Sequence, residues 1–308
     1  MQLKIKIILS VIIGFAIIYS CNSHDNPLAY QSDTHSRGKA TILIEESFKR
    51  LFDTSIYTFE SQFPKADIVP KYMAETDIID AFFQNKSKTI VISRDFTKKE
   101  KDILKSKQVE VRSGKIAIDA IALIVNPNNK DTLMTIDQLK DILSGKQAKW
   151  KSLNTKINVV YDQKNSANFN YLKEFCGEEN MQKNIFAVNS NEEVINYVKK
   201  NPSAMGVIGL NWISDQDDFD VLDFLEGIKV VALSKSEKEK YFQPYAGFIY
   251  TKEYPLIRDI WIINKGKKSG LNTGFVLFMI GELGQTIVQK SALVPANAPV
   301  RLIQMIEE

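Results

Sequence analysis

Hydroxyl residues stand at four points where a predicted strand passes into a predicted helix. They are Ser47, Thr76, Ser93 and Ser166. A hydroxyl residue at the beginning of a helix presents its own O–H group, unpaired backbone N–H groups and the positive end of the helix dipole. Several such helix ends facing one cleft would bind an oxyanion without a metal ion. In open α/β folds, ligands bind at the carboxyl ends of the strands, which is where these residues stand.

Each position also fits a plainer interpretation. Ser and Thr are ordinary helix caps, and Arg94, next to Ser93, could form a surface ion pair. Glu45, Glu46 and Asp95 lie close to two of these hydroxyls. Their carboxylates would repel an anion unless one of them accepts a proton from it. The residues therefore indicate an anion site only if the helix ends converge.

The residues that most hydrolases and zinc enzymes need are scarce in this chain. Both histidines, His24 and His35, lie near the N-terminus, and the two cysteines are Cys21 and Cys176. No glycine-rich phosphate loop, HExxH or GxSxG motif is present. We therefore expect a protein that is not an enzyme and that holds no metal and no cofactor.

Length and charge exclude further classes. The chain has 308 residues, which corresponds to about two domains. Hydrophobic residues make up 44% and charged residues 25%, an ordinary globular composition. Lys and Arg total 40 against 37 Asp and Glu, and the lysines alternate with acids. No continuous basic surface is expected, so a nucleic acid is not predicted as a partner.

The N-terminal segment has the pattern of an export signal. Lys4 and Lys6 precede an apolar run over 7–19. This run is shorter than the roughly 20 residues of a membrane span and fits the core of a signal peptide. It ends at Ser20 and Cys21, which resemble a bacterial lipobox.

We accordingly predict a lipoprotein signal peptide over 1–20, a lipid on Cys21 and a flexible tether over 21–39. The protein would then be exported and anchored by lipid to a bacterial membrane, in the periplasm or at the cell surface. The alternative is a plain signal peptide or a membrane anchor, with Cys21 incidental.

Beyond residue 39, short apolar runs alternate with helical patterns, which is typical of βαβ units and largely parallel sheets. The predicted strands cover 40–44, 67–69, 89–93, 116–125, 158–161, 205–208 and 228–233. Capping boxes begin helices at Thr97 and Thr135, and Ser190 caps another. A last helix with one apolar face is expected over 274–289.

Two of the apolar runs are candidates for crossings between domains. The run over 116–125 would lead from a first lobe into a second, and the run over 228–233 would return. We therefore predict a first lobe over 40–120, a second lobe over 121–228 and a return to the first lobe over 229–308.

Four segments carry a resemblance to a known family. They are the Asn-Pro-Asn to Trp stretch over 126–150, Ala-Met-Gly-Val-Ile-Gly over 204–209, Tyr-Pro-Leu-Ile-Arg over 254–258, and the Gly-Gln-Thr-Ile-Val and Leu-Val-Pro pieces over 284–295. Together they resemble the periplasmic phosphate-binding proteins of ABC transporters, from about residue 40 to about residue 300. The resemblance implies an α/β protein with the type II periplasmic-binding-protein fold, in which two α/β lobes enclose a ligand cleft.

The resemblance and the helix ends together define the predicted ligand residues. They are Ser47, Phe48, Thr76, Ser93, Arg94, Ser166, Ala167 and Asn168. The hydroxyls and backbone amides would donate to the ligand, and Arg94 would supply charge. The sequence departs from the family at two points: Arg94 follows Ser93 where the family has a carboxylate, and Asp162 stands near the family's arginine.

The expected function is that of a solute-binding lipoprotein. It would capture a small oxyanion, phosphate first of all, and present it as a monomer to an ABC permease in the inner membrane. The alternative keeps the fold and changes the role, to a surface receptor or sensor module with a different ligand and no part in transport.

Overall fold

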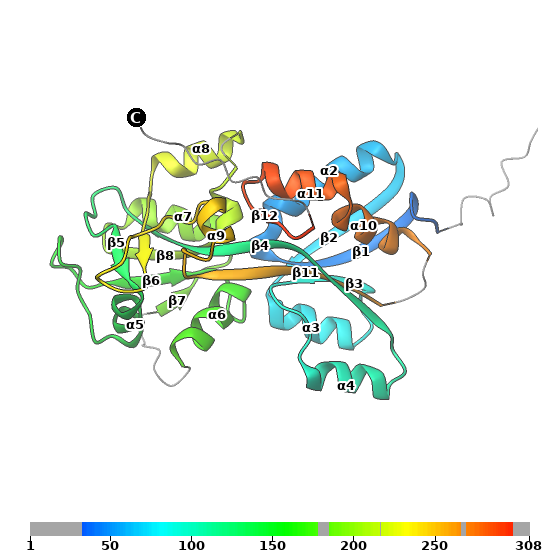
Figure 1. The fold of residues 1–308 in the computed structure, drawn as a ribbon, viewed down its shortest axis with the longest axis horizontal. Coiled ribbons are helices and arrows are strands. Elements are labelled where there is room, and N and C mark those ends of the chain that lie inside the picture. The colour runs from blue at the N-terminus through cyan, green and yellow to red at the C-terminus, as the bar shows by residue number, and fades with distance from the viewer. Residues whose placement is uncertain (1–32, 178–184, 216, 266–268, 298–308) are drawn as a thin grey trace, which may run out of the picture.

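The computed structural model describes residues 33–177, 185–215, 217–265 and 269–297 (Figure 1). The predicted signal peptide, Cys21 and the tether up to residue 32 lie outside these residues. The first lobe begins with β1 (Arg37–Glu45), the short 3-10 helix η2 (Glu46–Phe48), α2 (Lys49–Gln62), β2 (Lys65–Met73), α3 (Glu75–Phe83), β3 (Thr89–Ile92) and α4 (Lys98–Ser106). A long strand follows, β4 (Val111–Val125).

The second lobe alternates strands and helices in the same way. It contains β5 (Leu133–Thr135), α5 (Ile136–Ser144), β6 (Asn158–Tyr161), α6 (Ala167–Cys176), β7 (Ile185–Ala187), α7 (Asn191–Lys200), β8 (Ala204–Gly209), η4 (Leu210–Trp212), α8 (Phe219–Glu226), β9 (Lys229–Val230), β10 (Ala232–Ser234) and α9 (Ala246–Tyr250). The chain then runs through β11 (Ile257–Lys265), α10 (Leu271–Ile280), α11 (Glu282–Lys290) and β12 (Val294–Pro295).

Local sequence explains most of these elements. The buried core of β1 includes Ile42, Leu43 and Ile44, as expected of a strand covered on both faces. Helix α2 buries residues three and four apart, Leu51, Ile56 and Phe59 among them, and the chain leaves the helix just before Pro64. The two predicted capping boxes are present at the beginnings of α4 and α5. The predicted Ser190 cap also forms, because its hydroxyl accepts from the N–H of Glu193.

Strand β4 joins the two lobes. The strand order along the sheet is β2-β1-β3-β11-β4-β8-β6-β7. The first part of β4, up to Ala120, is antiparallel to β11, and from Ile121 onward β4 is antiparallel to β8. In Figure 1, β4 and β11 lie side by side through the middle of the molecule, between the two lobes. The segment over 116–125 thus changes its pairing partner from β11 to β8, as a crossing between lobes requires.

The return crossing predicted over 228–233 is wrong. In that segment β9 pairs with the far end of β4, and β10 pairs with β5, so both strands lie in the second lobe. The chain returns instead through β11, which begins with Ile257 opposite Ala120. An apolar run of this length fits a buried strand at either place, and pairing partners decide between them. The pairing favours a lobe boundary near residue 256 over the predicted boundary at 228.

The single helix predicted over 274–289 is two helices. Helices α10 and α11 meet at Gly281, whose backbone is extended, and their axes differ by 59°. A β-carbon at Gly284 would lie 2.4 Å from the carbonyl oxygen of Phe278, so this glycine allows the close approach of the two helices. Among the described residues no single helix is long and apolar enough to cross a membrane, although this bent pair passes that test on length and composition.

Candidate anion-binding site between the lobes

A buried carboxylate lies where helix N-termini from the two lobes meet. Glu45 ends β1, and its Oε2 accepts a hydrogen bond from the backbone N–H of Ser47 at 2.8 Å and another from the Ser47 hydroxyl. Its Oε1 accepts from the backbone N–H of Ala167, the first residue of α6, at 3.1 Å. All three residues are almost completely buried. One carboxylate thus binds backbone donors from both lobes.

Arg258 places a buried positive charge beside these donors. It belongs to β11, and its guanidinium donates to Oδ2 of Asp119 through Nε and Nη2, at 2.9 and 2.8 Å. Nη2 also donates to the Ser47 hydroxyl at 2.9 Å, and Nη1 donates to Oδ1 of Asn168 at 2.8 Å. The guanidinium carbon lies 4.7 Å from the centre of the Phe48 ring. Arg258 therefore links the crossing strands to a residue of each lobe.

A second pair of carboxylates lies on the other side of the network. Asp162 follows β6, and its Oδ1 accepts from the Ser166 hydroxyl at 2.6 Å. The side chain of Asn191, the first residue of α7, donates to Asp162 at 3.1 Å and to Glu46 at 2.5 Å. The Asn191 amide oxygen accepts from Asn168 and from the backbone N–H of Gly209, at 3.1 and 3.0 Å. Asn191 therefore holds the beginnings of two helices and the end of β8 together.

The charges of this network do not balance at high pH. Within the described ranges, it contains four buried carboxylates, Glu45, Glu46, Asp119 and Asp162, and a single arginine, Arg258. Burial raises the pKa of Glu46 to about 7. Burial and the charge of Asp162 raise the pKa of Glu45, and burial and the charge of Glu46 raise the pKa of Asp162. The network is therefore built to hold protons near neutral pH.

Four of the predicted ligand residues lie together in this network: Ser47, Ser166, Ala167 and Asn168. Phe48 contributes its ring beneath Arg258. The structure thus brings together predicted residues from the first and second lobes. Figure 1 shows the elements that carry them, with β1 and α6 on opposite sides of the crossing strands.

The other three predicted residues have partners of their own. The backbone N–H of Thr76 donates across the cleft to the carbonyl oxygen of Asn165 at 3.2 Å. Ser93 donates to Oε2 of Glu75 through its backbone and its hydroxyl, at 2.9 and 2.5 Å. The Arg94 guanidinium binds both oxygens of Glu100, at 2.8 and 2.9 Å, and Glu75 lies 3.6 Å from its Nε. Arg94 is thus already neutralised by carboxylates of the first lobe.

Sequence reasoning missed the arginine, the carboxylates and Asn191 as members of the site. Two signals were available for the central ion pair. Asp119 is the single charged residue within the apolar run over 116–125, and a charge in a buried strand needs a partner. Arg258 lies in the Tyr-Pro-Leu-Ile-Arg segment that carried the family resemblance. Nothing in the local sequence pointed to Asn191.

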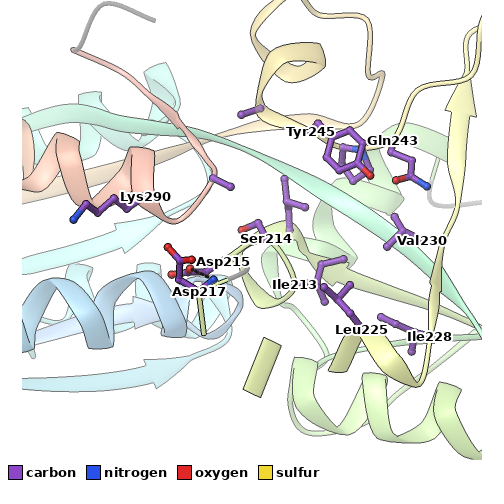
Figure 2. Close-up of a pocket in the computed structure, with 14 residues that line it drawn as sticks. Ile213, Ser214, Asp215, Asp217, Leu225, Ile228, Val230, Gln243, Tyr245 and Lys290 are labelled. Carbon is purple, nitrogen blue, oxygen red and sulfur yellow. Dashed lines mark hydrogen bonds between the residues drawn. The ribbon is translucent and has the colours of Figure 1, made fainter. Parts of the chain in front are cut away.

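A separate cavity of about 540 Å³ lies beside η4 and the residues that follow it, Ile213 and Ser214 (Figure 2). Its lining mixes apolar side chains, such as Ile213 and Leu225, with polar ones, and Asp215 and Lys290 lie at one side of it. None of the predicted ligand residues lines this cavity. Within the described residues, no group of three or more His, Cys, Asp and Glu side chains is arranged to hold a metal ion. The candidate site is therefore the packed polar network between the lobes.

Comparisons with known proteins agree with this architecture. The family model described as the PBP superfamily domain matches residues 29–282. The phosphate-binding protein PstS of Borreliella burgdorferi is 23% identical over 305 residues, which cover 94% of this chain and 97% of that relative. PstS of Staphylococcus epidermidis (strain RP62A) is 30% identical over 228 residues, covering 70% of this chain and 63% of the relative, so the match spans less than two thirds of that protein.

Solved structures show the same fold. A candidate phosphate ABC transporter substrate-binding protein from Clostridium perfringens, with bound phosphate, has a TM-score of 0.71 at 22% identity and covers 84% of this chain and 100% of its own. An ABC-type phosphate transport receptor from Vibrio cholerae has a TM-score of 0.62 at 20% identity, with coverages of 84% and 100%. These relatives are binding proteins and not enzymes, as expected. The resemblance and the two-lobed type II fold are thereby confirmed, and the chain belongs to the PBP superfamily.

Proposed function

We propose that this protein is an exported solute-binding protein that captures a small oxyanion, with phosphate the first candidate, and delivers it to an ABC permease. The observation that carries the proposal is the pair of backbone N–H groups, of Ser47 and Ala167, that converge on one carboxylate from the two lobes. The relatives named phosphate-binding protein PstS support the choice of ligand and of partner.

The donor set suits an oxyanion for a physical reason. A carboxylate is itself an oxyanion, and here its two oxygens accept donors from the beginnings of η2 and α6. The positive charge of Arg258 lies beside these donors, because its Nη2 donates to the Ser47 hydroxyl. Hydrogen bonds to an ionised acceptor are about twice as strong as neutral ones, and both donors are shielded from water. A ligand that bridges these donors would hold the two lobes together.

The backbone donor of Ala167 can be removed without disturbing its helix. Ala167 is the first residue of α6, and Ser166 before it has the extended backbone that proline requires of its neighbour. Ala167→Pro should therefore lower phosphate affinity roughly tenfold to a hundredfold, the cost of one hydrogen bond to a charged group. The affinity is measured by calorimetric titration with phosphate and with sulfate.

Lys98→Pro is the matched control. Lys98 is the exposed first residue of α4, and Thr97 before it is also extended. This variant should bind phosphate as the wild type does. If the wild type binds neither anion, the proposed ligand class is wrong, and mass spectrometry of the gently purified protein would reveal what it carries instead. That result would favour the receptor or sensor role over transport.

We also propose that the protein is anchored through lipid on Cys21, on the basis of the signal-like segment that precedes it. Cys21→Ser should block the lipid modification and shift the protein from the detergent-soluble membrane fraction to the soluble fraction, or leave it unprocessed. A wild-type protein with an unmodified mature N-terminus and no membrane association would contradict the anchor and leave the ligand proposal untouched.

A further inference from the structure

We propose that Glu45 is a built-in occupant of the anion site, and that phosphate enters by displacing this carboxylate with uptake of a proton. The inference rests on the proposed function, since it assumes that the donors around Glu45 serve a ligand. It goes beyond that function by naming the residue that sets the affinity and its dependence on pH.

Two backbone donors of the site are already bound by Glu45. The N–H groups of Ser47 and Ala167 both point at the Glu45 carboxylate, at 2.8 and 3.1 Å. Each backbone N–H makes one good hydrogen bond, so a ligand cannot use these donors while Glu45 holds them. Glu45 is 0% exposed, and so its carboxylate has no solvated position within the closed network. Binding of an anion therefore requires the carboxylate to move or to lose its charge.

The charges around Glu45 determine whether a proton is taken up when an anion binds. The ionisable groups that act on Glu45 come from every element packed against it: Glu46 of η2, Glu75 of α3, Asp162 after β6 and Arg258 of β11, with Asp119 of β4 paired to Arg258. All but one of these groups are acids. A phosphate ion would add negative charge to a buried cluster that already has too few cations, unless the cluster takes up a proton. Burial raises the pKa of Glu45, so this proton is available near neutral pH.

The same contact bridges the lobes in the absence of a ligand. Glu45 lies at the end of β1 in the first lobe, and Ala167 begins α6 in the second. A bound anion would make the same bridge between helix N-termini. The carboxylate thus takes the place of the ligand in holding the cleft closed, and removing it should let the lobes separate.

A buried acceptor without a partner belongs to a side chain that is bonded to Ser47. Asn211 is 2% exposed, and its Nδ2 donates to the carbonyl oxygen of Ser47. Its Oδ1 has no hydrogen-bond partner among the described residues. A buried acceptor of this kind is satisfied by a hydroxyl donor, which a protonated phosphate has and a sulfate ion at neutral pH lacks.

The test compares phosphate binding by the wild type, Glu45→Gln and Glu60→Gln between about pH 5.5 and about pH 9.5, because the pKa of Glu45 is raised to about 8. Because phosphate itself titrates in this range, the readout is the ratio of each variant's affinity to that of the wild type at the same pH. Gln has the shape of Glu and no charge to compete with an anion. For Glu45→Gln we expect a ratio near one at the acidic end and at least tenfold tighter binding at the alkaline end, since uptake of one proton changes affinity tenfold per pH unit above the pKa.

Glu60→Gln is the matched control, because Glu60 is a half-buried carboxylate of α2 that also accepts from a backbone N–H, that of Ile68 at 2.7 Å, and it lies outside the polar network. Its ratio should stay within about threefold at every pH. If Glu45→Gln binds phosphate no better than the wild type at any pH, Glu45 is not a competitor and the inference fails, even though the proposed function stands.

Small-angle scattering without ligand separates the remaining cases. Glu45→Ala should have a larger radius of gyration than the wild type, and Glu60→Gln should not. If no variant binds phosphate, the proposed ligand is wrong, and an opened Glu45→Ala still shows that Glu45 holds the cleft closed. If Glu45→Ala stays as compact as the wild type, the occupant role is wrong whichever ligand binds.

Discussion

Two clusters of acids around an arginine differ in almost every respect. In the first, beside β3, Arg94 is 39% exposed and binds Glu100 through two hydrogen bonds, within a single capping segment of the first lobe. In the second, between the lobes, Arg258 is 2% exposed in its side chain and binds Asp119, Ser47 and Asn168. The first cluster is local and solvated, and the second is buried and joins distant segments.

The difference appears in the protonation of the acids. Burial by itself raises the pKa of Glu100, but hydrogen bonds from Arg94 and Thr97 outweigh it and leave the pKa below its usual value. In the buried cluster, desolvation outweighs every favourable contact, and the pKa values of Glu45, Glu46 and Asp162 are all raised. Because Arg94 already donates to Glu100 in its own capping segment, few of its hydrogen-bond donors remain for a ligand. The arginine available to the site is the one surrounded by more acid than it can neutralise.

Removal of the buried arginine should have the largest effect on stability. Arg258→Met leaves Asp119 buried without its partner, and breaking a buried ion pair in this way costs about 3–5 kcal/mol. We expect the free energy of unfolding, measured by urea titration, to fall by that amount and phosphate binding to be lost. A fall of less than about 1 kcal/mol would mean that Arg258 does not support the buried cluster.

Changing pH should affect the two clusters in opposite directions. Burial raises the pKa of Glu46 to about 7 in the folded protein, above the 4.5 of an ordinary glutamate, so the folded state binds more protons between these values. Its stabilising contribution is therefore complete below about pH 4.5 and is lost as the pH rises through about 7. At about 1.4 kcal/mol per pKa unit, the loss is on the order of 3 kcal/mol.

Thermal melting at about pH 5 and about pH 8 checks this expectation. The melting temperature should be lower at the higher pH, and Glu46→Gln should reduce the difference. The lowered pKa of Glu100 works the other way, because its contribution is lost only as the pH falls toward the acid range. A melting temperature that is constant or rises from pH 5 to pH 8 would contradict the raised pKa values.

Ser166→Asp tests the site from the second lobe. The Ser166 hydroxyl donates to Asp162, which an aspartate cannot do, so two buried carboxylates would meet. Sequence reasoning alone predicts unchanged stability, since Asp caps a helix as well as Ser does. The structure predicts a loss of about 2 kcal/mol in the free energy of unfolding, typical of a hydrogen bond to a charged group, together with loss of phosphate binding.

Ser190→Asp is the control for that variant. Ser190 caps α7 by accepting from the N–H of Glu193, a role that Asp fills equally well. Its stability and its phosphate affinity should match those of the wild type. Equal melting temperatures for Ser166→Asp and Ser190→Asp would show that Ser166 is an ordinary cap.

The smallest effect is expected at Arg94. Arg94→Met removes an ion pair that is more than one third exposed on the arginine side, and such pairs contribute about 0–1 kcal/mol. Phosphate affinity should be unchanged, because Arg94 already binds Glu100 and Glu75. A large loss of binding in this variant would restore Arg94 to the ligand residues and contradict the contrast between the clusters.

The parts of the fold that depend on neighbours in sequence could be predicted. The capping boxes at Thr97 and Thr135 involve partners three residues apart, and both form as expected. The strand over 116–125 was recognisable from its apolar run, and the family motifs indicated the two-lobed fold. The pattern of hydroxyl residues at strand ends also identified Ser47 and Ser166 as candidate site residues, and both lie in the polar network.

The tertiary structure decided the rest, because the deciding contacts join residues far apart in the chain. Glu45 meets Ala167 across 122 positions, and Arg258 meets Asp119 across 139. The apolar run marked Asp119 as a buried charge, but its pairing with Arg258 depends on which strands lie side by side, and no local pattern shows that. The return crossing at β11 was hidden for the same reason. The sequence by itself determined the family, the caps and the strand over 116–125, and only the packing of the lobes determined which acids share a buried arginine and which one bridges the two lobes.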